Sequence, residues 1–226
     1  MAAARHAVYF APAAEHPLWQ AGCRWLGRDA RAGQPSSPSP SAERQAPWRY
    51  GFHATLKAPM AFASAKRKAD WLDEVAAFAG RQRAFAIPRL CVTMLDDFVA
   101  LCPIAPPRAG EPLRHLADAC VTGLDAARAP LSPQERARRL RPGLSERQRR
   151  QVERWGYPHV LDDWRFHMTL TGPLKPASAE RSRAEAAACF GAALEAPLVC
   201  DALCVFEEAS PGAPFFLTHR FAFGSR

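Results

Sequence analysis

Long hydrophobic runs are absent from this 226-residue sequence. No apolar stretch approaches the ~18 residues that a helix needs to cross a bilayer. The N-terminal stretch MAAARHAVYFAPAAEHPLW also lacks a continuous apolar core of signal-peptide length, because His6 interrupts it. These absences argue against a membrane protein and against a secreted one, so we expect a cytoplasmic location.

Metal-binding spacings are absent as well. None of the seven cysteines forms a C-x-x-C pair, and no histidine lies in an H-E-x-x-H pattern. The number of cysteines is odd and several lie in apolar runs, which favours reduced, buried thiols over disulfides or a zinc site. We therefore expect no metal and no other cofactor.

Lysine is scarce, with 4 residues against 26 arginines, yet the formal net charge is +8. A positive charge fits an anionic partner, but an arginine bias in a chain rich in alanine and proline is also typical of codon composition. The charge therefore indicates a phosphorylated ligand only weakly. Eight arginines lie between positions 136 and 154 without interleaved aromatic residues. We interpret this segment as a solvated helical face rather than a nucleic-acid patch.

The hydrophobic fraction of 48% is enough for one sizeable core, and the length is short for two independent domains. Periodicity and capping residues predict an alternation of helices and strands. We expect strands at 6–10, 50–56 (stopped by Pro59), 85–95, 98–104, 164–171, 198–207 and 215–223, and helices at 16–28, 64–79, 111–126 and 179–194, with short capped helices from Ser132 and Ser145. The segment 31–47 is rich in Pro and Ser, which predicts a surface loop, either a disordered insertion or a lid.

One short pattern occurs twice. Phe-His-x-Thr-Leu-x-x-Pro spans residues 52–59 and again 166–173, and the two histidines are 114 positions apart. Leu-Cys-Val also recurs, at Leu90 and Leu203, 113 positions apart, which is half of the chain length. Each half has the expected order of motif strand, helix, strand, strand. The repeats predict an internal duplication and one domain over residues 1–226, with pseudo-symmetric lobes at about 1–105 and 106–226.

Strand alternation gives the repeated motif two different faces. Side chains at positions i and i+2 of a strand point the same way, whereas the intervening ones point to the opposite side. Phe52, Ala54 and Leu56 therefore form an apolar face that fits a core. The polar positions of the two motif strands are His53, Thr55 and Lys57 in the first, and Arg165, His167, Thr169 and Thr171 in the second.

If the two lobes face each other, these polar faces line one cleft. Histidine titrates near neutrality, so one neutral ring can take a proton from water while a protonated ring gives one to a leaving oxygen. Thr55 and Thr169 can donate to the non-bridging oxygens of a phosphoryl group. The remaining polar groups, Lys57, Arg165 and Thr171, can stabilise its charge. This set predicts in-line hydrolysis of a phosphodiester without a metal.

The longer context of the motifs resembles a known family. The stretches AVYFAP from Ala7, RYGFHATLKAP from Arg49, LSERQRRQVERWGYPHV from Leu144 and DWRFHMTLTGPL from Asp163 are similar to the 2H phosphoesterase superfamily. They look most like its branch of uncharacterised proteins encoded beside phosphonate-degradation genes. The resemblance implies an α+β fold of two pseudo-symmetric lobes, with antiparallel sheets lining a central cleft and helices outside. It also implies that His53 and His167 are catalytic and that Thr55 and Thr169 bind phosphate.

Three functions compete at this point. The first is a metal-independent cyclic phosphodiesterase acting on a small-molecule cyclic phosphate, such as a ribosyl cyclic phosphate from phosphonate breakdown. The second keeps the chemistry but acts on RNA ends that carry a 2',3'-cyclic phosphate. The third is a nucleotide- or RNA-binding module without catalysis, which the presence of both histidines argues against. The near-equivalence of the halves leaves open which histidine is the acid, and the oligomeric state stays unknown.

Overall fold

The computed structural model describes residues 4–33, 38 and 41–224. Its elements alternate along the chain, and short 3-10 helices are marked η. The elements are β1 (Arg5–Phe10), α1 (Pro17–Leu26), η1 (Ala42–Arg44), α2 (Gln45–Tyr50), β2 (Ala54–Met60), α3 (Ala65–Gly80), β3 (Phe85–Ala86), β4 (Leu90–Leu95), β5 (Phe98–Pro103), α4 (Pro112–Gly123), α5 (Pro133–Arg139), α6 (Glu146–Trp155), η2 (Leu161–Asp163), β6 (Met168–Thr169), α7 (Pro176–Phe190), η3 (Ala192–Glu195), β7 (Val199–Cys200), β8 (Ala202–Glu208) and β9 (Phe215–Ala222).

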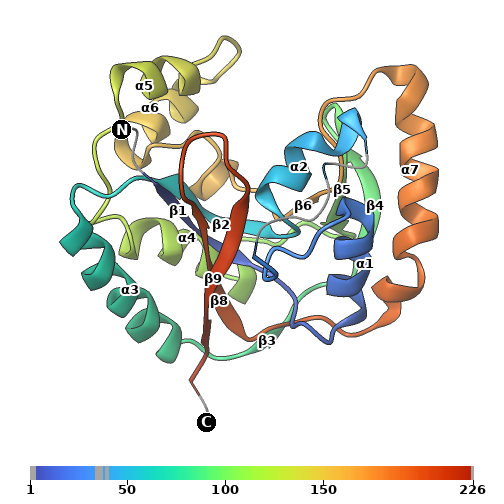
Figure 1. Cartoon of the computed structure of the whole chain (residues 1–226), viewed down its shortest axis with the longest axis horizontal. Coiled ribbons are helices and arrows are strands. Elements are labelled where there is room, and N and C mark those ends of the chain that lie inside the picture. The colour runs from blue at the N-terminus through green and yellow to red at the C-terminus, as the bar shows by residue number, and fades with distance from the viewer. Residues whose placement is uncertain (1–3, 34–37, 39–40, 225–226) are drawn as a thin grey trace.

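An antiparallel sheet in the order β4-β5-β6-β2-β1-β8-β9 carries the fold, and β3 pairs with β7 in a small separate sheet. Strands β4, β5 and β6 lie with α1 and α7 on one side of the molecule, whereas β1, β2, β8 and β9 lie with α3 and α4 on the other (Figure 1). Strand β1 is buried throughout. The predicted α+β class, with helices outside an antiparallel sheet, is confirmed.

The two lobes do not coincide with residues 1–105 and 106–226. Helix α3, which follows motif strand β2, packs on the late hairpin β8–β9, and α7, which follows motif strand β6, packs on the early hairpin β4–β5. Strand β6 also lies between β5 and β2. Each lobe therefore combines a motif strand and helix from one half of the chain with a hairpin from the other. The order of elements recurs in the two halves, with one more short strand in each (β3 and β7) than predicted, and the duplication itself stays a prediction.

Two local expectations need correction near the first motif. Residues 45–50 form α2 rather than the end of a loop, and Pro47 is buried. The earlier residues 34–37 and 39–40 of the predicted loop lie outside the described residues. Pro59 does not stop β2, which runs to Met60, because the pairing with β1 is irregular between Lys57 and Met60. Proline is tolerated where a strand's ladder is interrupted.

The second motif strand is shorter than the predicted 164–171. Strand β6 covers only Met168 and Thr169. Before it, the Trp164 indole N–H donates to the carbonyl of Thr55 at 2.8 Å, so this segment is held by a side chain rather than by a ladder. After it, the N–H groups of Leu170 and Thr171 both donate to the carbonyl of Val99. Both ends of the strand are therefore irregular.

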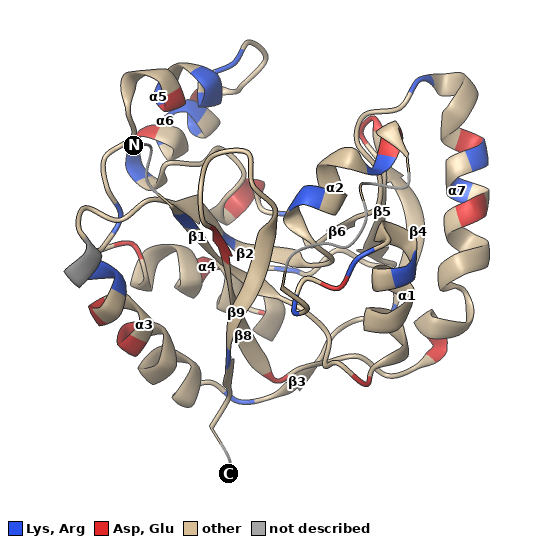
Figure 2. Ribbon diagram, in the orientation of Figure 1, with Lys and Arg blue, Asp and Glu red and all other residues tan. Residues whose placement is uncertain are grey.

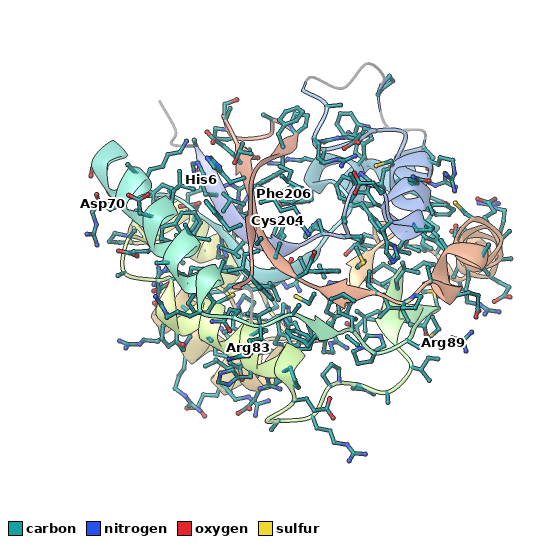
Figure 3. All side chains as sticks on the ribbon, turned by 90° about the horizontal axis from the view of Figure 1, so that it is seen from below. His6, Asp70, Arg83, Arg89, Cys204 and Phe206 are labelled. Atoms are coloured by element: carbon teal, nitrogen blue, oxygen red, sulfur yellow. The ribbon has the colours of Figure 1, made fainter. Side chains whose placement is uncertain are left out.

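The core is aromatic around the sheet and extends under both lobes. Cys204 and Phe206 of β8 lie inside the molecule, whereas Asp70 of α3 and Arg89 lie at its edge (Figure 3). All seven cysteines are free, as predicted, and burial raises the pKa of the Cys204 thiol to about 12. In the described ranges, no helix has both the length and the apolar character that crossing a membrane requires.

Gly22 of α1 is required by the close approach of Phe52, the residue before His53. A Cβ at position 22 would lie 2.2 Å from Cγ of the buried Phe52 ring, which stacks on Phe190. We expect Gly22→Ala to destabilise the fold by about 1–3 kcal/mol through overpacking. The control is Gly80→Ala at the end of α3, where a Cβ meets no atom within 4 Å. Urea unfolding of both variants tests this, and equal losses would contradict it.

Candidate active site

A single registered pair joins the two motif strands. Ala54 of β2 lies opposite Met168 of β6 in an antiparallel arrangement, and both side chains are fully buried. Extending this register by one residue in each direction sets Thr55 across from His167 and Thr169 across from His53. Directly opposed residues on antiparallel strands have Cβ atoms about 4.5–5.5 Å apart. The register therefore gathers both histidines and both threonines on one face, with each histidine facing the other motif's threonine.

This face lines a cleft. His53, Thr55, His167 and Thr169 all border a hollow of ≈ 460 Å³. An adjoining hollow of ≈ 520 Å³ shares Thr55, His167 and Thr169 with it, so the second motif strand lies where the two meet. Volumes of this size are typical of small-molecule sites. The cleft lies between the two lobes, as the facing of the two motifs predicted.

His53 is held in one orientation from three sides. Its Nδ1 lies 2.8 Å from the carbonyl oxygen of Gly51, which can only accept, so the ring carries its proton on Nδ1. Its Nε2 lies 3.2 Å from the Thr55 hydroxyl. The ring stacks on Tyr9 with centroids 3.7 Å apart. Gly51 has a φ of 77°, in the region that favours glycine, and it ends α2 so that its carbonyl meets the ring.

Burial lowers the pKa of His53 to about 4; the Gly51 carbonyl acts in the opposite direction, and His167 lowers the pKa further. The imidazole of His53 is therefore neutral at pH 7. A neutral ring with its proton on Nδ1 leaves the Nε2 lone pair available. His53 is thus equipped to accept a proton from a water molecule in the cleft.

His167 repeats this geometry on the other motif. Its Nδ1 lies 2.9 Å from the carbonyl oxygen of Arg165, again two residues earlier in the chain. The ring lies beside Phe98, with centroids 5.8 Å apart. Burial lowers its pKa, the Arg165 carbonyl opposes this shift, and the charges of Arg165 and His159 lower the pKa further. Both histidines therefore present Nε2 rather than Nδ1 to the cleft.

A β-bulge in β2 overturns the expected position of Lys57. Strand β1 pairs Tyr9 with Thr55 but Val8 with Lys57, so Leu56 is an extra residue in β2. Such a bulge shifts the alternation of side chains by one position. Lys57 therefore lies on the core side together with Leu56, and not on the face that carries Thr55.

The contacts of Lys57 agree with this position. Its side chain is buried, and its ammonium donates to Asp125 at 2.7 Å and to the carbonyl of Val121, in α4, at 3.2 Å. Burial lowers its pKa, although Asp125 acts in the opposite direction. Lys57 is thus a structural residue beneath α4, and the prediction that it contacts phosphate is corrected.

The other two predicted phosphate contacts border the second hollow. Arg165 is half-exposed, and its guanidinium donates to Asp96 at 2.6 Å. Thr171 is buried, and its hydroxyl accepts from the N–H of Val99 at 3.0 Å. Both side chains therefore have structural partners already, and a contact with substrate stays a prediction for them.

Sequence reasoning missed a wall of the cleft. Arg138, Arg139, Arg141, Tyr157 and His159 all border the hollow that holds both histidines. The end of α5 carries Arg138 and Arg139 to the cleft and the turn after it carries Arg141, and Figure 2 shows basic residues on this part of the chain. The capping boxes predicted both α5 and α6, but no sequence pattern indicated that the segment between these helices turns toward the cleft.

The predicted solvated face is thus only partly correct. Arg136, Arg147 and Arg150 do form ion pairs at the surface, with Glu153, Asp163 and Glu146 respectively. The arginines that border the cleft behave differently. Together with Arg5, they give the hollow four guanidinium groups, and no carboxylate of the described residues borders it. The cleft is therefore suited to an anion.

Metal ligation has little support from the donor set. Across residues 4–33, 38 and 41–224, no three His, Cys, Asp or Glu side chains group closely enough to hold a metal ion. The site thus consists of imidazoles, hydroxyls and guanidinium groups.

Two H-x-T segments thus face one cleft in an antiparallel sheet, which is the arrangement that the resemblance to 2H phosphoesterases implied. The chain belongs to the family described as "Protein of unknown function (DUF1045)", which matches residues 55–216. One relative, named "Ribose 1,5-bisphosphate phosphokinase PhnN" from Janthinobacterium sp. (strain Marseille), is 39% identical over 240 residues, covering 98% of this chain and 51% of the relative. A protein of the same name from Laribacter hongkongensis (strain HLHK9) is 38% identical over 219 residues, covering 94% and 50%. The chain spans about half the length of these curated relatives.

Solved structures with a similar arrangement have low sequence identity to this chain. A structure titled "Crystal structure of phosphoesterase" has a TM-score of 0.46 and 16% identity, covering 98% of this chain and 99% of that one. E. coli LigT complexed with 3'-AMP has a TM-score of 0.47 and 14% identity, covering 99% and 100%.

Proposed function

We propose that this protein is a metal-independent phosphodiesterase that opens a cyclic phosphodiester by two-histidine acid–base catalysis. The observation that carries the proposal is the Ala54–Met168 register, which, extended by one residue in each direction, sets the histidine of each motif across from the other motif's threonine. Both rings turn Nε2 toward an arginine-lined cleft. An anion-binding module without catalysis would need the arginines, but not two histidines in matching orientations.

The proposed reaction adds one water molecule to the ring diester. Neutral His53 removes a proton from the water at Nε2 while the water oxygen bonds to phosphorus. The bond from phosphorus to one ring oxygen breaks, and protonated His167 gives its proton to that oxygen, which leaves as a hydroxyl. The product is a phosphate monoester, and the two rings have exchanged protonation states. Thr55 and Thr169 donate to the non-bridging oxygens as their charge grows.

The assignment of His53 as the base and His167 as the acid rests on the different surroundings of the two rings. The pKa of His53 is lowered to about 4, so this ring is the poor acid and stays available as the base. Burial lowers the pKa of His167 as well, but its ring has the Asp96 carboxylate nearby, whose charge acts in the opposite direction and favours the protonated ring. A bound anionic phosphate favours it further, because an opposite charge stabilises an imidazolium.

The proposed substrate is a small ribosyl cyclic phosphate from phosphonate breakdown. Two curated relatives carry a name that specifies ribose 1,5-bisphosphate as a substrate, which supports a sugar phosphate. RNA ends with a 2',3'-cyclic phosphate are the competing substrate. A panel containing ribose 1,2-cyclic phosphate, adenosine 2',3'-cyclic phosphate and a short RNA with a cyclic end, each with and without EDTA, separates these cases. Loss of all hydrolysis with EDTA would overturn the metal-free mechanism, and activity on RNA alone would overturn the sugar substrate.

The plot of kcat/KM against pH should be bell-shaped, with its maximum at acidic pH. The base His53 must be neutral, which holds above a pH of about 4, and the acid His167 must be protonated, which holds only below its lowered pKa. The maximum of kcat/KM, which reports the free enzyme, is therefore expected below the ordinary histidine pKa of about 6.5. For kcat, the falling limb should move to higher pH, because bound phosphate stabilises protonated His167. A kcat/KM that keeps rising above pH 7 would contradict the assignment.

A further inference from the structure

Three arginines of the cleft have no role in the two-histidine reaction. Arg138 and Arg139 end α5, and Arg141 lies in the turn after it. Within the part of the chain that the structure describes, none of the three forms an ion pair, in contrast to Arg136, whose guanidinium is neutralised at the surface by Glu153. These three guanidinium groups therefore border the cleft without a carboxylate partner among the described residues, so their charge faces the hollow unneutralised.

Arg139 is the most unusual of the three. Its guanidinium donates to the carbonyls of Gly156 at 2.5 Å and Pro59 at 3.1 Å, and its buried Nε has no partner. Burial lowers its pKa, although Tyr157 acts in the opposite direction. A helix C-terminus favours a cation, which accounts for a charge at this position but not for a half-buried side chain whose Nε is fully buried. Burying a cation without a carboxylate partner costs free energy, and a bound anion that pairs with the cation lowers this cost.

Arg141 and Arg138 place further positive charge along the cleft. Arg141 borders both hollows, and its charge contributes to the lowered pKa of His159. Arg138 is exposed and borders only the hollow that holds His53. The three arginines come from a different element than the motif strands. They are therefore additional to the threonines that face the reacting phosphate.

We propose that Arg138, Arg139 and Arg141 form a second anion site, which binds a terminal phosphate monoester of the substrate whose cyclic diester lies between His53 and His167. This inference rests on the proposed function and narrows it to sugar cyclic phosphates that carry a second phosphate group. Guanidinium groups suit this role because they bind phosphate through paired N–H groups. Three cations match a dianionic monoester better than the single charge of a diester.

The test compares ribose 1,2-cyclic phosphate with and without a 5-phosphate. We expect the wild type to prefer the phosphorylated probe in kcat/KM by about tenfold or more, the range of a charged hydrogen bond. In the double variant Arg138→Ala/Arg141→Ala, this preference should fall toward one. Both residues are exposed, so folding should be retained. The control is Arg149→Ala, an exposed arginine of α6 that does not border the cleft and should keep the wild-type preference.

The outcomes separate the second site from the proposed function. Hydrolysis of both probes with no preference in the wild type would overturn the second site and leave the phosphodiesterase. A preference that survives in the double variant would also overturn it. If neither probe is hydrolysed, the proposed function fails, and calorimetry with ribose 5-phosphate decides the second site. Binding that the double variant loses and Arg149→Ala keeps supports the site, whereas no binding, or equal binding in all three proteins, overturns it.

Discussion

Replacing either cleft histidine with alanine is expected to lower kcat for a ribosyl cyclic phosphate by about 10²–10⁴-fold, the usual contribution of a general acid or base. In the proposed mechanism, His53→Ala removes the group that takes the proton from water, and His167→Ala removes the group that protonates the leaving oxygen. Steady-state kinetics at the wild-type optimum measures both losses. The matched control is His115→Ala, an exposed histidine of α4 that should retain wild-type kcat.

A change of leaving group separates the two roles. A p-nitrophenyl phosphodiester releases a stable phenolate, which needs no proton from the enzyme. His167→Ala should therefore recover most of its lost activity on this substrate, whereas His53→Ala should not, because the water still has to lose its proton. Recovery in His53→Ala alone would exchange the two assignments. Full activity of either variant on the cyclic phosphate would remove that histidine from the mechanism.

Loss of the Glu208 carboxylate is expected to destabilise the fold by about 3–5 kcal/mol, the usual cost of removing one partner from a buried ion pair. Glu208 is fully buried, accepts from Arg5 at 2.5 Å and from Gly212 at 3.0 Å, and is also ion-paired with Arg49. In Glu208→Gln, two guanidinium groups lose their shared negative charge. The measurement is urea unfolding at pH 7.

The contribution of Glu208 should also depend on pH. Burial tends to raise its pKa, but the hydrogen bonds from Arg5 and Arg49 outweigh this and hold the pKa below its usual range. Because the folded-state pKa is depressed, the stabilisation is complete above the unfolded pKa of about 4.3 and is lost as the pH falls through the folded value. The control is Glu195→Gln, which breaks the exposed pair with Arg89 and should cost about 0–1 kcal/mol. Equal costs for the two variants would contradict the prediction.

The sequence was sufficient to predict which side chains of the two motifs share one face, because strand period and motif repeat are local signals. Alternation placed His53 and Thr55 on one face, and the same rule placed His167 and Thr169, as the Ala54–Met168 register shows. It failed at Lys57, only two residues beyond Thr55. A bulge depends on how the partner strand pairs, and nothing in the motif itself signals the extra residue.

Long-range features were beyond sequence reasoning for a related reason. The capping boxes located α5 and α6 correctly. The direction in which the turn carries Arg141 depends on packing against the rest of the cleft, which no local pattern encodes. The lobes were likewise drawn as successive halves, because proximity along the chain is the default for strand pairing. Only the three-dimensional structure shows that β8–β9 completes the lobe of β2.

Each lobe takes its hairpin from the other half of the chain, and this arrangement has consequences for the origin of such a chain and for its folding. A half-length protein with one motif strand, one helix and one hairpin could not cover its own helix in this arrangement, because that helix packs on a hairpin of the other half. Two copies would have to swap hairpins about a two-fold axis, with one histidine from each copy in the shared cleft. In the single chain, β1 pairs with β8 across nearly the full length of the sequence, so the lobe of β2 is incomplete until the C-terminal hairpin is in place. The lobe of β6 needs only the earlier hairpin β4–β5 and α7. We expect the cleft to form only when both lobes are present, so two separately expressed halves should acquire it only when mixed.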